Sequence, residues 1–246
     1  MSHLFCPSCT LHDRRNFLRF AGTSATLLGA GLFAVPAHAV ALSKAQRDKM
    51  TPDEILKLMK DGNQRFRKGN RQNRDVLAQQ RQTAKGQHPA AVLLSCIDSR
   101  APAETIMDLG IGDIFNNRIA GNIANDDILG GLEFACKLSG AKVVLVMGHT
   151  ACGAIKGAID NAELGNLTGL LAKIKPAVQA TTYSGPRTSS NYPFVDAVAR
   201  KNVELTIAEI RSRSPVLREL EASKALKIAG AMYDLQTGVV DFSISS

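Results

Sequence analysis

The sequence predicts an α/β fold: a mostly parallel central sheet flanked by helices, with an antiparallel strand at its C-terminal edge. Apolar, β-branched runs alternate along the chain with segments whose apolar residues recur at helical spacing, a pattern typical of parallel sheets with right-handed crossovers. The chain then ends in two apolar runs joined by a short turn, which predicts a hairpin. With 246 residues, 45% of them hydrophobic, it is long enough for one well-buried core, and we expect a single domain over 40–246.

The first half of this domain shows clear start signals for its helices. Thr51 and Glu54 form a capping box around Pro52, and apolar residues then recur at helical spacing until Gly69. A continuous apolar run follows, as expected for a strand buried on both faces. The predicted elements are helices at 52–68 and 75–84, strands at 90–95 and 113–117, and a helix that is capped at 125–127 and stops near residue 140.

The second half opens with "KVVLVM", another apolar β-branched run that predicts a buried strand. A Ser/Gly/Pro-rich stretch marks a loop further on. The predicted elements are a strand at 142–147, helices at 153–160 and 166–180, a loop at 183–193, a long helix at 194–213, and strands at 226–234 and 239–244 around a turn at 236–238.

The first 39 residues are expected to be an export signal. The segment "DRRNFLRF" resembles the twin-arginine export signature, and the apolar run behind it ends in Ala37-His38-Ala39, a pattern typical of a cleavage site. That run is shorter than the roughly 20 residues of a spanning helix, which argues against a stable membrane span. We expect cleavage after about Ala39 and a periplasmic protein. Cleavage also removes Cys6 and Cys9, whose C-x-x-C spacing lacks the βαβ context of a redox motif.

The charge of the chain does not indicate nucleic-acid binding. The net charge is +8, but lysines and arginines are scattered, Trp is absent and aromatic residues make up 5% of the chain. Nucleic-acid binders usually combine a clustered basic surface with stacking aromatic residues or a known module. We therefore expect no nucleic-acid partner.

Reactive side chains follow two of the predicted strands. "SCIDSR" places Cys96 after strand 90–95, and "GHTACGAI" places His149 and Cys152 after strand 142–147. The carboxyl ends of neighbouring parallel strands meet at one edge of a sheet, so these side chains converge if the two strands are neighbours. Two thiolates and an imidazole are three of the four ligands of a tetrahedral Zn²⁺ site, whose fourth position can hold water or substrate. The alternative is that the thiols are small buried apolar groups, which is what we expect of Cys136.

Together with "GDIFNNRIAGN" and "GAMYDLQTGVVDF", these motifs resemble a β-class carbonic anhydrase over roughly residues 50–243. The resemblance implies one Zn²⁺ per subunit and reversible hydration of CO₂ to bicarbonate and a proton by zinc-bound hydroxide. It also implies a homodimer or higher homo-oligomer. By the same resemblance, Asp98 and Arg100 form a catalytic carboxylate–guanidinium pair. Gln87 and Phe115 match residues that line the substrate pocket at a dimer interface, and Gly153 matches one whose backbone N–H faces substrate.

Three positions qualify the resemblance. Ile97 and Ile119 replace the commoner small polar residue and asparagine of the family motifs, but neither is a ligand. In some family members the aspartate leaves its arginine and becomes the fourth zinc ligand, and those gated by bicarbonate carry Trp three residues before the first cysteine. Here that residue is Leu93. We therefore expect an open site near neutral pH, with Asp98 as a fourth ligand only in a closed state.

Two other functions remain open from the sequence. One is hydrolysis of CS₂ or carbonyl sulfide by a zinc enzyme of the same fold. The other is a non-catalytic, zinc-stabilised protein that binds bicarbonate, although such a protein would not need Asp98, Arg100 or Gln87. An α-class carbonic anhydrase is excluded because it needs three histidines, and only His88 and His149 follow the leader. His88 is the histidine that remains as a candidate for proton transfer.

Overall fold

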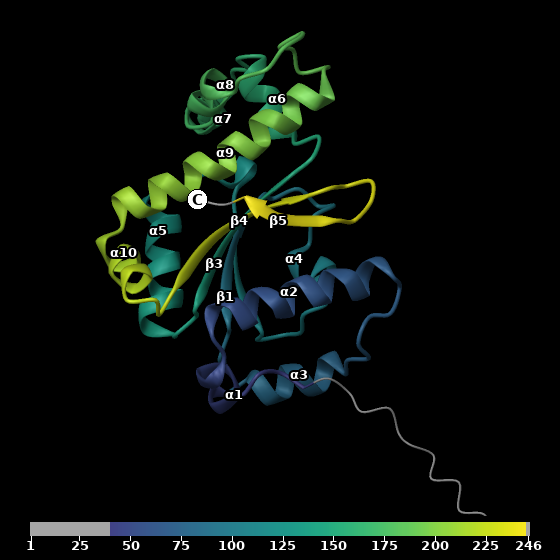
Figure 1. The fold of residues 1–246 in the computed structure, drawn as a ribbon, viewed down its shortest axis with the longest axis vertical. Helices are drawn as coiled ribbons and strands as arrows, with labels where there is room; N and C mark the ends of the chain where they lie inside the picture. The colour runs from purple at the N-terminus through teal and green to yellow at the C-terminus, as the bar shows by residue number, and fades with distance from the viewer. Residues whose placement is uncertain (1–39, 245–246) are drawn as a thin grey trace, which may run out of the picture. The chain divides into compact units, whose positions relative to one another are not determined.

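Five strands form the central sheet of this computed structural model, which describes residues 40–244 (Figure 1). Their order is β2-β1-β3-β4-β5; the first four run parallel and β5 runs antiparallel to β4, as predicted. The strands are β1 (Ala91–Ser95), β2 (Ile114–Arg118), β3 (Val143–His149), β4 (Lys227–Tyr233) and β5 (Val240–Ile244). The predicted leader, residues 1–39, lies outside the described residues.

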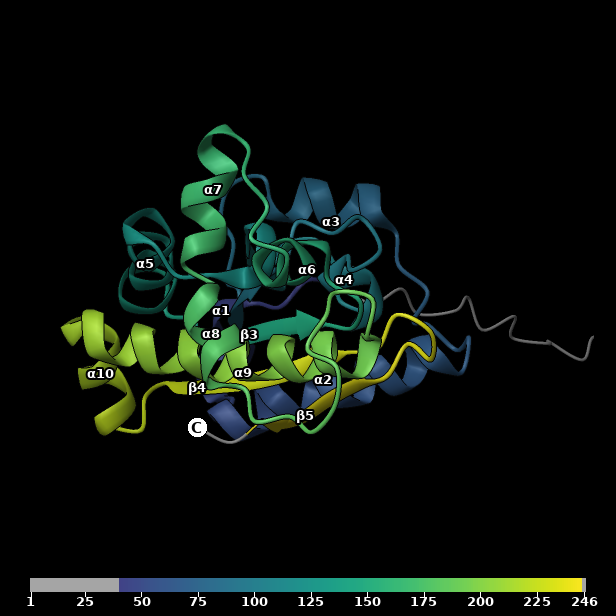
Figure 2. The same cartoon turned by 90° about the horizontal axis from the view of Figure 1, so that it is seen from above.

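The middle strands β1 and β3 are buried along their whole length. Because successive side chains of a strand point to opposite faces, Val92 and Leu94 join one apolar cluster while Leu93 joins the other. Helices α2 (Pro52–Arg67) and α4 (Ala103–Ile106) cover the face of Leu93. The other face is covered by helices α5 (Asp126–Glu133), α6 (Gly153–Ile159), α8 (Lys175–Ala180), α9 (Tyr192–Arg213) and α10 (Pro215–Ala222). Figure 2 shows α9 running alongside β4, with α10 at one end.

Side-chain caps start the helices where the sequence predicted them. Thr51 and Glu54 close the capping box of α2, Asp75 caps α3 (Val76–Thr83), and Asn125 caps α5. The predicted core thiol, Cys136, is buried in the same cluster as Val92 and Leu94. The other short elements are α1 (Lys44–Lys49), η1 (Ala120–Asn122), the π-helical turn η2 (Phe134–Leu138) and α7 (Gly165–Ala172).

The structure divides the helix predicted at 166–180. It breaks into α7 and α8 at Pro176. In a continuous helix the ring of this proline would clash with the carbonyl of Ala172, four residues earlier, and Ala172 is the last residue of α7. The helix predicted from 125–127 to about residue 140 is continuous, and its last turn, η2, is π-helical. Helices α1, α4 and α10 were not predicted, although Ser43 caps α1 and Ser214 caps α10. Within residues 40–244, none of the helices has the length and apolarity to span a membrane.

Candidate metal centre

The sheet brings the two sequence motifs to the same edge. β1 and β3 are parallel neighbours in which Ser95 pairs with Met147, so Cys96 and His149 both lie at carboxyl ends. Cys152 stands at the N-cap position of α6, three residues beyond His149, and its side chain makes no capping hydrogen bond. The ligand atoms of these three residues lie within 4.8 Å of one another, and all three side chains are buried. The convergence expected from the sequence is therefore present.

The donor set fits a zinc ion. The two sulfur atoms are 4.0 Å apart, close to the ~3.8 Å that two Zn–S bonds of about 2.3 Å span in a tetrahedral site. His149 Nδ1 lies 2.9 Å from the carbonyl oxygen of Thr150, and a proton on Nδ1 leaves Nε2 with a lone pair. Nε2 is buried and has no hydrogen-bond partner among residues 40–244. A metal ion would satisfy this nitrogen and both sulfurs at once.

The charges of the three ligands depend on one another. The Cys152 thiol lowers the pKa of Cys96, whereas burial raises it. His149 and the Gly121 N–H, which lies 3.4 Å from the Cys96 sulfur, lower the pKa of Cys96 further. The same proximity raises the pKa of Cys152. Burial lowers the pKa of His149, but Cys96, the Thr150 carbonyl and Asp98 together outweigh burial, and the net shift is upward. The pocket alone thus stabilises one thiolate, and a bound cation is needed to hold two.

Asp98 lies at the mouth of this ligand set. Its two oxygens accept hydrogen bonds from Arg100, Oδ1 from Nε at 3.0 Å and Oδ2 from Nη2 at 2.8 Å. The Arg100 guanidinium lowers the pKa of the Asp98 carboxyl, which stays ionised at neutral pH. Asp98 Oδ2 is also 3.9 Å from His149 Nε2, too far for a hydrogen bond. The carboxylate therefore faces the ligands while Arg100 holds both of its oxygens.

The residues assigned to the substrate pocket lie apart from this centre in the single chain. Gln87 is exposed and precedes β1, whereas Cys96 follows it, so a strand of about 16 Å separates them. Phe115 lies on β2 opposite Val92 and packs edge-to-face against Phe134, with ring centroids 6.1 Å apart. Gly153 does lie at the centre: it is the exposed first residue of α6, directly after Cys152.

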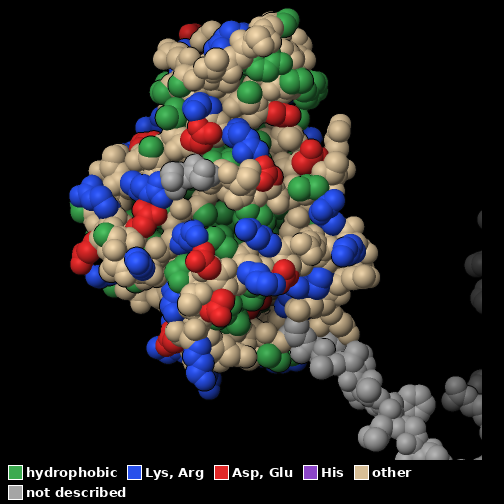
Figure 3. All heavy atoms as spheres, viewed as in Figure 1, with side chains coloured by type: hydrophobic (Ala, Val, Ile, Leu, Met, Phe, Trp, Pro, Cys, Tyr) green, Lys and Arg blue, Asp and Glu red, His purple; other side chains and the backbone are tan. Residues whose placement is uncertain are grey.

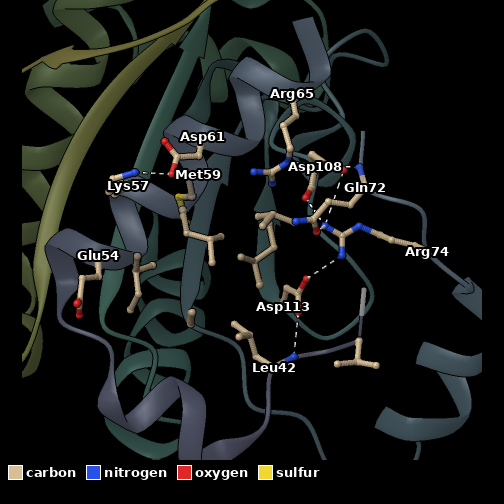
Figure 4. A pocket seen from close by; sticks show the side chains of 16 residues that line it. Leu42, Glu54, Lys57, Met59, Asp61, Arg65, Gln72, Arg74, Asp108 and Asp113 are labelled. Atoms are coloured by element: carbon tan, nitrogen blue, oxygen red, sulfur yellow. Dashed lines mark hydrogen bonds and ion pairs between the residues drawn. The ribbon is translucent and has the colours of Figure 1, made fainter. Parts of the chain in front are cut away.

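A separate cavity of about 350 Å³ lies under α2, at the amino ends of β1 and β2 (Figure 4). Its polar wall contains two ion pairs: Asp108 accepts from Arg65 Nε at 2.6 Å, and Asp113 Oδ2 lies 3.9 Å from Arg74 Nη1. This cavity is on the edge of the sheet opposite Cys96. We therefore do not assign the chemistry to it.

Three residues near the centre were not found from the sequence. Arg118, at the end of β2, donates from Nε to the Cys96 carbonyl at 2.9 Å and from Nη2 to the Asp98 carbonyl at 2.5 Å. Its place at the end of a strand beside β1 was a usable signal. On α9, Asp196 contacts the loop between His149 and Cys152, and Asn202 contacts Gly121, whose N–H faces the Cys96 sulfur; no local motif marks either of them.

Comparison with known proteins identifies the family. The family model described as carbonic anhydrase matches residues 91–240. Carbonic anhydrase 2 of Mycobacterium tuberculosis is 34% identical over 193 residues, covering 76% of this chain and 90% of that protein. A crystal structure titled as the β-carbonic anhydrase CafA of Aspergillus fumigatus superposes with a TM-score of 0.60 at 28% identity, covering 68% of this chain and 80% of that one.

The chain belongs to the β-carbonic anhydrase family. A chain from the crystal structures of two tetrameric β-carbonic anhydrases of Sordaria macrospora gives a similar match, with a TM-score of 0.59, 26% identity, and coverage of 68% of this chain and 90% of that chain. The carbonic anhydrase of Mycolicibacterium smegmatis is 30% identical over 196 residues, covering 77% of this chain and 92% of that protein. The predicted α/β fold and the predicted family are thus confirmed.

Proposed function

We infer that this protein catalyses the zinc-dependent, reversible hydration of CO₂ to bicarbonate and a proton. The observation that carries this conclusion is the convergence of Cys96, His149 and Cys152 beside the Asp98–Arg100 pair, in a chain of the carbonic anhydrase family. The relatives are named carbonic anhydrases, which favours CO₂ over CS₂ or carbonyl sulfide as substrate. A merely zinc-stabilised protein would not need a charged pair aimed at the ligand set.

Each side chain has a defined part in this reaction. Cys96, His149 and Cys152 would hold the zinc ion, which would lower the pKa of water toward neutrality and so supply the nucleophile for CO₂. The Thr150 carbonyl orients the His149 ring through Nδ1, which directs Nε2 at the metal position. The ionised Asp98 accepts a hydrogen bond from the nucleophile and directs its lone pair at the carbon of CO₂. Arg100 keeps the carboxylate ionised and fixes its orientation through two parallel hydrogen bonds.

The substrate pocket is completed by a second copy of the chain in this proposal. Gln87 and Phe115 lie away from their own metal centre, so they act on the centre of the neighbouring copy of a homodimer or higher homo-oligomer. Phe134, which packs against Phe115, is 52% exposed, and Leu138 is 76% exposed. These two side chains offer an apolar surface for such a contact. Analytical ultracentrifugation of the zinc-loaded protein tests this, and a stable monomer with full activity would contradict it.

The site is proposed to be open at neutral pH, with Asp98 paired to Arg100 rather than acting as a fourth ligand. The two hydrogen bonds between these side chains support this arrangement. Zinc K-edge spectroscopy at neutral pH should detect two sulfurs, one nitrogen and a solvent oxygen. A carboxylate oxygen of Asp98 in place of solvent would show a closed site.

The protein is proposed to be exported to the periplasm by a twin-arginine signal cleaved after about Ala39. This route carries folded proteins, so zinc can be bound in the reducing cytoplasm before the thiols of Cys96 and Cys152 meet oxidising conditions. Cell fractionation with N-terminal sequencing tests the location and the cleavage site. Rerouting the mature domain through a signal for unfolded chains should give less zinc and less activity per protein, and equal zinc occupancy by both routes would disprove the coupling.

The enzyme assignment is tested by a stopped-flow CO₂ hydration assay on the purified mature protein, alongside metal analysis. We expect turnover that requires zinc. Assays with CS₂ and carbonyl sulfide run in parallel distinguish the same-fold hydrolase. A folded, zinc-loaded protein without CO₂ hydration would refute the assignment.

A further inference from the structure

We propose that Asp196 and Asn202, both on helix α9, are positioning residues for the metal centre. Asp196 holds the loop between the ligands His149 and Cys152, and Asn202 holds the loop at Gly121, whose N–H supports the third ligand, Cys96. This inference rests on the zinc site of the proposed function, but it concerns metal binding and stands independently of the CO₂ reaction. Neither residue contributes a ligand atom to the cluster of Cys96, His149 and Cys152.

The first loop is strained and depends on Asp196. Ala151, between ligands His149 and Cys152, has a φ of 55°, in the left-handed region where a residue with a β-carbon is disfavoured by roughly 1–2 kcal/mol. Its N–H donates to Asp196 Oδ1 at 2.8 Å. This charge-assisted bond stabilises the conformation that turns Cys152 back toward His149.

The other side of the same loop is held by the sheet. Thr150 donates its N–H to the Tyr233 carbonyl at 3.0 Å, and its Oγ1 accepts from the Leu235 N–H at 3.0 Å. Asp196 is therefore the contact that comes from the helical layer, while β4 and the turn after it supply the contacts from the sheet. The loop between the two ligands is fixed from both sides.

The second loop is held by Asn202. Gly121 donates its N–H toward the Cys96 sulfur at 3.4 Å, and its carbonyl accepts from Asn202 Nδ2 at 2.7 Å in a buried position. Gly121 also has a φ of 68°, and a β-carbon there would lie 2.5 Å from Ile174 Cδ1. The Asn202 bond therefore fixes a glycine whose N–H supports the thiolate of Cys96.

Helix α9 is itself closely seated on the strand that ends in His149. A β-carbon at Gly148 would lie 2.8 Å from Val203 Cγ2 and 3.6 Å from the Ala199 carbonyl, so only glycine lets the helix approach this closely. In the sequence of α9, Ala199 lies between Asp196 and Asn202, and Val203 directly follows Asn202. One rigid helix thus sets the positions of both loops relative to β3.

Zinc affinity is the direct test of this role, measured by competition with a chromophoric chelator on the full mature protein. Loss of a residue that orients metal ligands typically weakens metal binding 10–100-fold, and we expect an effect of about this size for Asp196→Ala and for Asn202→Ala. Asp196→Asn keeps an acceptor for the Ala151 N–H and should bind zinc within a few-fold of wild type. The matched control is Asp241→Ala, which removes a carboxylate that also bonds to α9, through Arg200 at 2.5 Å, but touches neither ligand loop.

Two further measurements separate positioning from general stability. The Co²⁺-loaded protein should show an altered thiolate-to-cobalt absorption band in Asp196→Ala and an unaltered one in Asp241→Ala. Ala151→Gly, which adopts a positive φ without strain, should recover part of the affinity lost in Asp196→Ala. If Asp196→Ala does not fold, Asp196→Ser serves instead. The serine side chain is one carbon shorter than that of aspartate, so its hydroxyl oxygen does not reach the Ala151 N–H.

Zinc affinity and cobalt spectra that match wild type in both Asp196→Ala and Asn202→Ala would overturn the proposal. So would equal losses in Asp196→Ala and Asp241→Ala, since that result would reflect the stability of α9 alone. A wild-type protein that binds zinc but does not hydrate CO₂ would refute the proposed function and leave the role of α9 intact.

Discussion

Substituting Gly148 by alanine should disturb both the fold and the metal centre. The added methyl group would lie 2.8 Å from Val203 Cγ2 and 2.8 Å from Met232 Sδ, closer than van der Waals contact allows. The sulfur of Met232 can move, because methionine has three flexible torsions. Val203 is fully buried and β-branched, with one preferred rotamer in a helix, so α9 itself has to shift.

The size of the effect follows from this overlap. Inserting a methyl group into a well-packed core costs about 1–3 kcal/mol. For a domain of this size each kcal/mol lowers the melting temperature by about 2–4 °C, so Gly148→Ala should melt roughly 2–12 °C below wild type. Because α9 carries Asp196 and Asn202, its displacement should also weaken zinc binding.

Thermal unfolding followed by circular dichroism, with chelator and with excess zinc, measures both effects. The drop in melting temperature should be larger with zinc than with chelator, since zinc stabilises only the state with correctly placed ligands. The control is Gly169→Ala on the exposed side of α7, where a β-carbon meets nothing within 4 Å; it should gain about 0.5–1 kcal/mol. A Gly148→Ala protein that melts at the wild-type temperature and binds zinc normally would refute this account of the packing.

The other predictions concern the site itself. Cys96→Ser should lose both zinc and CO₂ hydration, and loss of activity with full zinc content, measured by atomic absorption, would contradict the ligand assignment. Arg100→Lys keeps the charge but not the two parallel bonds to Asp98; we expect a fall in kcat/KM of about 10–100-fold at unchanged zinc content. Gln87→Ala should lower kcat/KM without loss of zinc. If the Gln87→Ala and Cys96→Ser proteins are dissociated and mixed, part of the activity should return, because each mixed dimer has one intact zinc site facing an intact Gln87. Mass spectrometry verifies that mixed dimers have formed. If they form without any recovery of activity, Gln87 acts on the site of its own subunit.

The ligand set could be predicted because its information is local. Two buried strands could be recognised from their apolar runs, and Cys96 and His149 lie at or just beyond the ends of those strands. Parallel neighbours present their carboxyl ends at one edge, so the sequence positions of the ligands are enough to bring them together once β1 pairs with β3. Helix caps such as Thr51 were predictable for the same reason, since the capping contact spans three residues.

Separation along the chain is a poor guide to distance in space where a strand intervenes. Gln87 is nine positions from Cys96, but the extended strand between them advances about 3.3 Å per residue and carries the two residues to opposite edges of the sheet. The sequence determined which residue types were available for the pocket. Only the tertiary structure showed that the single chain does not bring them together.

The contacts of α9 belong wholly to the tertiary structure. Asp196 reaches Ala151 across 45 positions and Asn202 reaches Gly121 across 81, and neither contact follows from a period or a local motif. Both depend on where α9 crosses β3, which is decided by the close approach at Gly148. The sequence by itself thus determined the elements and the chemistry at the strand ends, because these arise from neighbours along the chain. The support of that chemistry arises from packing between layers, and only the folded molecule decides it.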